Sequence, residues 1–480
     1  MRNAEDAKSR ESRCLEPQLQ RLENPLSINA LNALRDGASC SDTMGCGGYV
    51  GLWGVGVKGR GLANGAPASH MVGMNGTENL PSSQPRPLVY LDTQDYSRFG
   101  DVLRGKSDNE HERIFQRLLE LKAAGAVTFV YSMPILGELL QFDENFAETT
   151  EYKARAVEQL CGEHALVYPG RLVALEAAEM LHREAPDRPE PLVTAYNNRN
   201  YWYPNVSDVF EGLKIRMQSQ LMGELGTLPF TGRALRRRIK AHAKKLDLAK
   251  VAREAAPDMA EEYGLPVAAV TQSIVGVLEG RVSTDEASHN LFGAIARPTS
   301  FVDVYFRRFE GEKTLPRWMR GAGENLQKLF EELKAKVAPY LDDPSHRKFL
   351  QTEIQGRRRS LGAGALLLAQ NDLQEFSIPP YVFQELRIDV DRAAKVPACF
   401  NVGTLLAAYA VQITGVQGHA SIERSFGGDL IHALYAPHVA LWRGDRRFSH
   451  LFRSVLPELG ERVVSRLSEL PEAIDRIMHT

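Results

Sequence analysis

The spacing of apolar and polar residues predicts alternating strands and helices between residues 87 and 184. The runs LVYL, AVTFVY and ALVY are short, apolar and β-rich, as buried strands are. Between and after them, segments such as NEHERIFQRLLELKAAG and RLVALEAAEMLHRE repeat apolar residues at helical spacing. Strands that alternate with helices of this length imply right-handed crossovers and a parallel sheet. Residues 87–184 are therefore predicted to form the first part of an α/β domain.

A second strand and helix pattern follows residue 425. The segment DLIHALYAPH has helical spacing, and the apolar runs VALW and RVVS come after it as expected strands. We expect residues 396–480 to complete the same domain. The stretch 185–395 is mostly helical in pattern, so it is predicted to be a large helical insertion that interrupts the sheet. Its end is placed near residue 395, because LGAGALLLAQNDLQEF fits either part.

The N-terminal segment differs from the rest in composition. Residues 37–66 are rich in glycine, and no helix signal follows, so their GxG patterns are not interpreted as a phosphate loop. A flexible, disordered segment over residues 1–86 is the expectation.

Composition bounds the class of protein. A chain of 480 residues with 43% hydrophobic residues can build more than one core. Its five cysteines form no CxxC pair, which argues against a disulfide framework or a structural zinc site and favours the reducing cytoplasm. No signal-peptide core or membrane-length apolar run is expected, so no membrane association is predicted.

Four acidic residues stand where strands should end or helices should begin. They are Asp92 after LVYL, Glu138 in the helix after the second strand, Asp429 at the start of DLIHALYAPH, and Asp445 after VALW. Ligands collect at the carboxyl ends of parallel strands. Mg²⁺ and Mn²⁺ prefer oxygen ligands, so the four acids are predicted to form a catalytic metal site.

Each of these acids also has a structural interpretation. Asp92 can close an Asx-turn, Asp429 can cap a helix after two glycines, and Asp445 can begin a turn. Three neighbours are further candidates near the site. Ser132 is expected to cap the helix that carries Glu138. Asp95 either supports the site or is a solvated turn residue, and His432 either contacts substrate phosphate or packs in the core.

The order of these residues resembles the PIN-like nuclease domain. Asp92 follows the first strand, Ser132 follows the second with Glu138 six residues later, Asp429 opens a helix after two glycines, and Asp445 follows a late strand. The resemblance covers residues 87–182 and 400–480. It implies a three-layer α/β/α domain with a central parallel sheet, and metal-dependent hydrolysis of phosphodiester bonds, usually in RNA. It assigns metal binding to the four acids, and to Ser132 the place of the small polar residue after the second strand.

Two features depart from the family pattern. A Thr or Ser commonly stands two residues before the last acid, where this chain has Arg443. Family members are also often much shorter, without so long an insertion.

The insertion contains the basic segments. Residues 231–253 hold nine Lys or Arg against one acid, with Leu235, Ile239 and Leu246 at helical spacing. Such a face can neutralise phosphates without reading sequence, although a solvated surface is the alternative. A second patch mixes arginines with aromatic residues in YFRRFEGEKTLPRWMR, and a third lies in QGRRRS. The predicted nucleic-acid-binding residues are Arg236, Arg237, Arg238, Lys240, Lys244, Lys245, Arg307, Arg308, Arg357, Arg358 and Arg359.

Together these patterns predict a metal-dependent nuclease that uses Mg²⁺ or Mn²⁺ and acts on nucleic acid, with RNA favoured over DNA. Two alternatives remain open. The first is a catalytically silent PIN-like scaffold that binds nucleic acid or protein, which Arg443 favours. The second is a metal-dependent phosphohydrolase of small phosphates.

Overall fold

The computed structural model describes most of the chain beyond residue 85. The described residues are 86–140, 146–191, 194–204, 207–210, 213–215, 248–308, 314–373, 375–415, 422–423 and 425–479. The predicted N-terminal tail, apart from residue 86, lies outside them. So do the basic residues Arg236, Arg237, Arg238, Lys240, Lys244 and Lys245 and the side chain of Arg308.

The centre of the molecule is a four-stranded sheet in which all strands are parallel, in the order β2-β1-β5-β6. Tyr131, just beyond β2, bridges in parallel to Ala165 of β3, so the chain continues the sheet on that side. β3 itself pairs antiparallel with β4. The strands are β1 (Leu88–Tyr90), β2 (Thr128–Val130), β3 (Ala165–Leu166), β4 (Tyr196–Asn197), β5 (Leu441–Arg443) and β6 (Val463–Val464). The predicted parallel sheet is thus confirmed.

The direction of the strand order changes at β1. From β1 the chain proceeds to β2 on one side, whereas β5 lies on the other side and β6 beyond it. Helices after strands on the two sides of such a point diverge and leave a crevice at the carboxyl ends of the strands. Asp92 follows β1 and Asp445 follows β5, so both lie at the ends of the two strands that flank this point.

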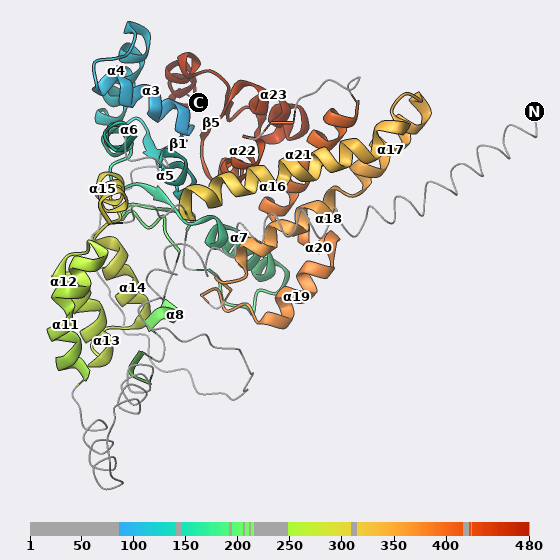
Figure 1. Ribbon diagram of the computed structural model, residues 1–480. Helices are drawn as coiled ribbons and strands as arrows, with labels where there is room; N and C mark the ends of the chain where they lie inside the picture. Colours follow the sequence, from blue (N-terminus) through green and yellow to red (C-terminus); the bar gives the residue numbers. More distant parts are fainter. Residues whose placement is uncertain are drawn as a thin grey trace, which may run out of the picture.

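The helices of the first part follow the predicted pattern. In α4, Phe115, Leu118 and Leu121 form the buried face, and Asp108 caps the helix. Figure 1 shows α3, α4 and α6 on one side of the sheet and α16, α21 and α22 on the other. The bounds are α3 (Thr93–Leu103), α4 (Asn109–Ala123), α5 (Met133–Leu139), α6 (Ala147–Cys161) and α7 (Pro169–Glu184).

The second part supplies the helices around the crevice. α22 begins with Phe426, and α23 begins after Asp445, which caps it. Phe448 and Phe452 bury one face of α23, while Arg446 and His450 are exposed. The bounds are α22 (Phe426–Ala433), η7 (Ala436–His438), α23 (Arg446–Val455), α24 (Pro457–Gly460), η8 (Leu467–Glu469) and α25 (Leu470–Met478).

The later helices of the predicted insertion share their core with the sheet. Leu326, Leu329 and Phe330 of α16 belong to the same buried cluster as Val89 and Trp442. α16 contacts α5, α21 and α22. The bounds are α16 (Thr314–Val337), η5 (Ala338–Tyr340), α17 (Pro344–Gly356), α18 (Arg358–Ala363), η6 (Gly364–Ala369), α19 (Pro380–Ile388), α20 (Val390–Ala393) and α21 (Pro397–Gly415).

Earlier helices of the insertion form a bundle with small cores of their own, seen at the lower left of Figure 1. α15 joins this bundle to the sheet domain, because Val302 and Tyr305 pack against Leu140 and Ala154. The bounds are α8 (Ser207–Phe210), α11 (Leu248–Tyr263), α12 (Val267–Val270), the π-helical turn η4 (Thr271–Val275), α13 (Gly276–Leu278), α14 (Thr284–Gly293) and α15 (Pro298–Arg308).

By length and composition, α21 could cross a membrane, which the sequence interpretation did not anticipate. In the structure, however, 78% of its apolar window is buried. Gly403 of α21 also crosses Gly362 of α18 so closely that a Cβ at Gly403 would lie 2.1 Å from the carbonyl oxygen of Arg358. A helix packed this way is accounted for as a core helix.

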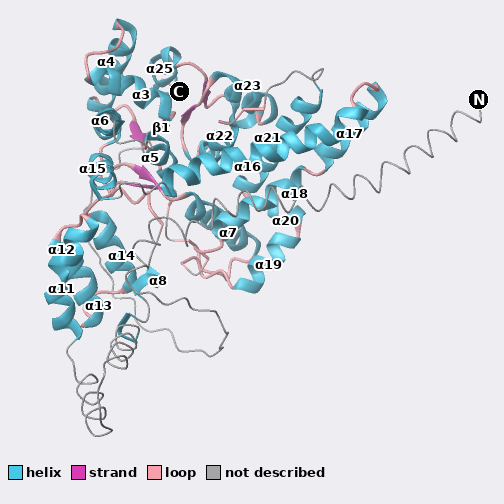
Figure 2. Ribbon diagram, in the orientation of Figure 1, coloured by secondary structure: helices cyan, strands magenta, loops and turns pink. Residues whose placement is uncertain are grey.

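The architecture is therefore mostly helical around a small parallel sheet, as Figure 2 shows, and it agrees with the predicted α/β class. The boundaries near residues 184 and 395 stay predictions.

Candidate functional site

The charges of the other three predicted acids act on Asp429. The pKa of Asp429 is well above its usual value, first because the carboxyl is buried and then because the charges of Asp445, Asp92 and Glu138 act on it. A hydrogen bond with Asp445 adds to the increase. Ionised carboxylates disfavour one another only when they are close. The chain thus gathers acids from four separate segments into one electrostatic environment.

Asp92 has both a structural and an electrostatic partner. Its Oδ1 accepts a hydrogen bond from the backbone N–H of Gln94 at 2.8 Å, which is the expected Asx-turn and also caps α3. Its Oδ2 lies 3.3 Å from Nη1 of Arg443. Burial raises the pKa of Asp92, and the Arg443 guanidinium opposes that increase.

Arg443 is the basic centre of the site. It ends β5, is 3% exposed, and places Nη2 at 2.9 Å from Oδ1 of Asp95 while Nη1 faces Asp92. A guanidinium presents its donors in a rigid fork, so one side chain can bridge two carboxylates. Arg443, which stands where the family pattern has Thr or Ser, therefore places a buried cation among the acids.

Asp95 is not the solvated turn residue that was expected. It is fully buried, and burial raises its pKa to about 7, although Arg443 opposes this. Its Oδ2 has no hydrogen-bond partner among the described residues. Of its two interpretations, the solvated turn is wrong, because Asp95 lies in the first turn of α3 with its side chain buried.

Two buried hydrogen bonds lead to His432, which forms an ion pair with Glu138. The Ser132 hydroxyl lies 2.6 Å from the Tyr90 hydroxyl, which lies 2.6 Å from Nδ1 of His432. Nε2 of His432 lies 3.1 Å from Oε2 of Glu138. Burial alone would lower the pKa of His432, but Glu138 outweighs it and raises this pKa. Burial would conversely raise the pKa of Glu138, but His432 outweighs it, and the pKa is lowered.

The surroundings of Ser132 and His432 differ in how they match the expectations for these residues. Ser132 is at the N-cap position of α5, but its side chain makes no capping hydrogen bond and bonds to Tyr90 instead. His432 is 7% exposed and lies between Tyr90 and Glu138, which matches the packing alternative. His432 therefore orients Glu138 and keeps it ionised.

Gly428 allows α22 to approach Glu138. A Cβ at this position would lie 2.6 Å from Oε1 of Glu138. The sequence marked the two glycines only as a motif before Asp429. Their spatial role, which is close approach of α22 to the α5 carboxylate, could be read only from the fold.

Asp445 caps α23. Its Oδ1 accepts hydrogen bonds from the backbone N–H groups of Arg447 at 2.7 Å and Phe448 at 3.0 Å. Asp445 therefore begins a helix and not the turn of its structural interpretation, and its charge acts on Asp429.

The donor chemistry fits a hard divalent cation. Four carboxylates supply oxygen ligands, and a cation would favour the ionised form of Asp429. In the described part of the chain, no three His, Cys, Asp or Glu side chains are already arranged to hold an ion. Arg443 lies within ion-pair distance of Asp92, and His432 lies within ion-pair distance of Glu138.

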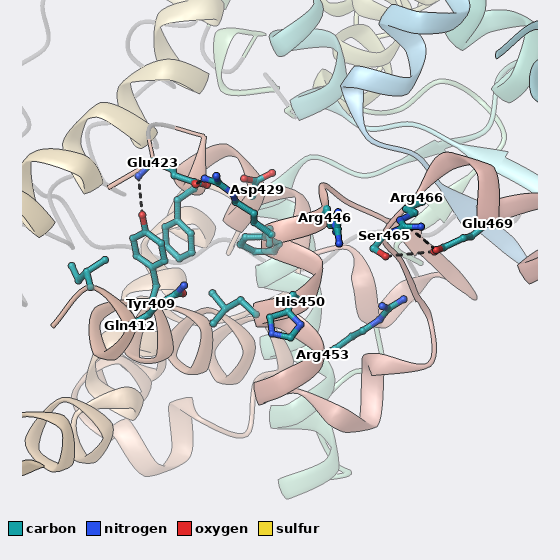
Figure 3. A pocket seen from close by; sticks show the side chains of 15 residues that line it. Tyr409, Gln412, Glu423, Asp429, Arg446, His450, Arg453, Ser465, Arg466 and Glu469 are labelled. Atoms are coloured by element: carbon teal, nitrogen blue, oxygen red, sulfur yellow. Dashed lines mark hydrogen bonds and ion pairs between the residues drawn. The ribbon is translucent and has the colours of Figure 1, made fainter. Parts of the chain in front are cut away.

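A cleft of about 770 Å³ opens beside the acids, and the sequence interpretation missed it. Asp429 lies on its wall, together with Tyr409 and Gln412 of α21 (Figure 3). The remaining wall comes from Glu423, Phe426 of α22, α23 and the segment after β6. Its basic residues are Arg446, Arg447, His450, Arg453 and Arg466.

The face of α23 explains how these residues gather. Arg446, His450 and Arg453 recur at intervals of four and three, so they lie on one side of the helix. Phe448 and Phe452 occupy the buried side. The periodicity of RRFSHLFR was the available signal, but only the fold shows that its polar face borders Asp429.

The described members of the predicted basic patches lie elsewhere. Arg307 is exposed and pairs with Asp303, and Arg357 lies 3.7 Å from Glu353. Arg359 pairs with Asp391, and Arg358 is exposed. These side chains do not line the cleft described above. Tyr305, an aromatic residue of the second patch, is buried.

No protein-family model, curated protein or solved structure matches this chain.

Proposed function

We propose that this protein is a metal-dependent nuclease that hydrolyses phosphodiester bonds, with RNA as the favoured substrate. The observation that carries the proposal is the Asp429 carboxyl, whose pKa is raised by burial and by three acids from other segments. Evolved sites gather like charges where a cation or a reaction requires them. The switch in strand order between β1 and β5 supports the same location.

Asp92, Glu138, Asp429 and Asp445 would hold Mg²⁺ or Mn²⁺. When bound, the ion supplies an acidified water and neutralises charge on the phosphoryl oxygens. His432 holds Glu138 ionised and oriented, and the helix cap on Asp445 fixes that carboxylate beside Asp429.

The three-layer PIN-like fold, the preference for RNA and a cytoplasmic location belong to this proposal. The first two rest on the resemblance in the order of Asp92, Ser132, Glu138, Asp429 and Asp445. The parallel strand order and the helices on both sides of the sheet are compatible with it. The location rests on the cysteine pattern.

The test is cleavage of end-labelled single- and double-stranded RNA and DNA by wild type and Asp429→Asn, with Mn²⁺, Mg²⁺ or EDTA. We expect metal-dependent cutting by wild type and a loss of at least about 100-fold in the variant, as for removal of a group that stabilises transition-state charge. Cutting that persists in EDTA would exclude the proposed chemistry. Hydrolysis of mononucleotides but not of polymers would favour a small-phosphate phosphohydrolase.

Stability gives a readout that does not depend on activity. Because the folded pKa of Asp429 is above its unfolded value, the stability contributed by the protonated form is lost as the pH rises through the folded pKa. An Asn side chain does not ionise, so Asp429→Asn does not lose this stability as the pH rises. In EDTA, the variant should melt above wild type at pH 8, and the difference should shrink toward pH 5. If the variant and wild type had equal melting temperatures at both pH values, Asp429 would not belong to the acidic cluster.

Arg443 favours a second candidate, a non-catalytic scaffold that binds nucleic acid. Its guanidinium already compensates Asp92 and Asp95. A protein that binds RNA with salt dependence but cuts no substrate in any metal would be this scaffold.

A further inference from the structure

We propose that the cleft between α21, α23 and the end of β6 binds the sugar-phosphate backbone of a single-stranded nucleic acid and leads it to the acidic cluster. The direction of the strand rests on the proposed nuclease function, whereas the binding itself does not. Asp429 lies in the wall of the same cleft, so a strand bound there reaches the carboxylates (Figure 3).

The polar face of α23 has the length for several phosphates. Arg446 follows Asp445 directly, and Arg453 comes seven residues later on the same face. Seven residues of α-helix rise about 10 Å. Stacked nucleotides of one strand are spaced about 3.4 Å apart along the axis, so the face spans about three of them. Figure 3 shows Arg446, His450 and Arg453 succeeding one another along the helix.

Some basic side chains of the cleft form no ion pair within the described part of the chain. Arg447 pairs with Glu423, and Arg466 lies 3.8 Å from Glu469. Arg446 and His450 are exposed and have no ion-pair partner among the described residues. The two groups without a partner lie on the part of α23 nearest to Asp445. A polyanion would therefore gain most at the end of the cleft that adjoins the acids.

The size of the cleft favours a single strand over a duplex. Its volume of about 770 Å³ falls in the range of small-molecule sites, which is room for a few nucleotides. Specific duplex binding buries about 1,000–2,500 Å² of protein surface and needs an open face. Phosphate contacts from arginine position a strand without reading its bases, so binding should be tolerant of sequence.

The experiment is fluorescence anisotropy with a short fluorescein-labelled single-stranded RNA in EDTA, where metal-dependent cleavage is suppressed. The test variant is Arg446→Ala/Arg466→Ala, which removes one arginine from each wall. We expect affinity about tenfold weaker at low salt and a slope of log K against log salt lower by about 1.4, since each phosphate contact contributes about 0.7. Unlabelled duplex of the same sequence should compete poorly.

The control is Arg113→Ala/Arg183→Ala, which removes the same charge from exposed positions on α4 and α7. Its affinity and salt slope should match wild type. An unchanged slope in Arg446→Ala/Arg466→Ala, or no RNA binding by wild type, would overturn the inference. Equal competition by a mononucleotide would overturn it as well, by identifying a small-phosphate pocket.

The two proposals fail separately. If wild type cuts nothing in Mn²⁺ but the cleft variant loses RNA binding, RNA binding by the cleft is supported and the nuclease proposal is wrong. If wild type cuts RNA and the cleft variant binds RNA as tightly as wild type does, the nuclease proposal is supported and RNA binding by the cleft is wrong.

Discussion

At the scale of single residues, the site is governed by how buried charges are paired. Asp95 is fully buried, and Arg443 is 3% exposed and reaches both Asp95 and Asp92. A buried ion pair contributes little compared with apolar packing, but removal of one member leaves the other without compensation. Arg443 therefore holds Asp92 and Asp95 together, and it would compete with the proposed metal ion for the carboxylate of Asp92.

Replacement of Arg443 by an apolar side chain of similar length tests this role. We expect Arg443→Met to lower the free energy of unfolding in EDTA by about 3 kcal/mol, because Asp95 loses its cation in a buried setting. Mn²⁺ should then raise the melting temperature more in the variant than in wild type, since the carboxylate of Asp92 is released. Thermal unfolding with and without Mn²⁺ measures both effects.

Arg447→Met is the matched control, since Arg447 pairs with Glu423 on the surface and its side chain is 77% exposed. Exposed ion pairs contribute little to stability, so this variant should melt close to wild type. If Arg443→Met were as stable as Arg447→Met, the bridge between the acids would have no energetic role.

At the scale of elements, the sequence predicted the strands and most of the helices near the site. Runs such as LVYL and VALW are apolar throughout because both faces of a parallel sheet are covered; β1 lies within the first, and β5 begins in the second and ends one residue beyond it. The four acids could be placed because they follow or open such elements. The partners of these acids could not, because Arg443 and His432 reach them from segments more than 290 residues away.

The crossing of α18 and α21 was also beyond the sequence. Gly362 and Gly403 are 41 positions apart, and nothing in their local pattern shows that their backbones touch. Helices approach this closely only where both present small residues. LGAGALLLAQ was open to either part of the chain, and the structure packs its first residues directly on α21.

A methyl group at Gly403 should therefore force the two helices apart. The added Cβ would lie 2.1 Å from the Arg358 carbonyl oxygen and 2.9 Å from Cα of Gly362, which are backbone atoms that cannot rotate away. We expect Gly403→Ala to cost about 1–3 kcal/mol, as overpacking does. Urea unfolding measures the change.

Gly356→Ala is the control for helix propensity. Gly356 ends α17, and an added Cβ there meets nothing within 4 Å. This variant should be as stable as wild type or more stable by up to about 1 kcal/mol. Equal gains at both positions would show that α18 and α21 do not cross at these glycines.

At the scale of the whole molecule, the later and earlier helices of the predicted insertion pack into different cores. Residues of α16 belong to the core that surrounds the sheet, while α11 and η4 contribute to smaller clusters. Phe330 of α16 meets Tyr409 of α21 and Phe426 of α22 with ring centroids 5.0 and 6.0 Å apart. Because α22 carries Asp429, the later insertion supports the helix on which the acidic site depends.

Cooperative unfolding should follow this division. Phe330→Ala removes a buried ring that is 4% exposed, at a cost of about 3–5 kcal/mol. We expect native-state hydrogen exchange to show faster opening of α16, α21 and α22 together, because one core joins them. Val275→Ala, in a separate cluster, should speed exchange in α11 and α14 and leave α22 unchanged. If Phe330→Ala accelerated only α16, the insertion would be an independent unit that merely rests on the sheet domain, and Asp429 would be held without it.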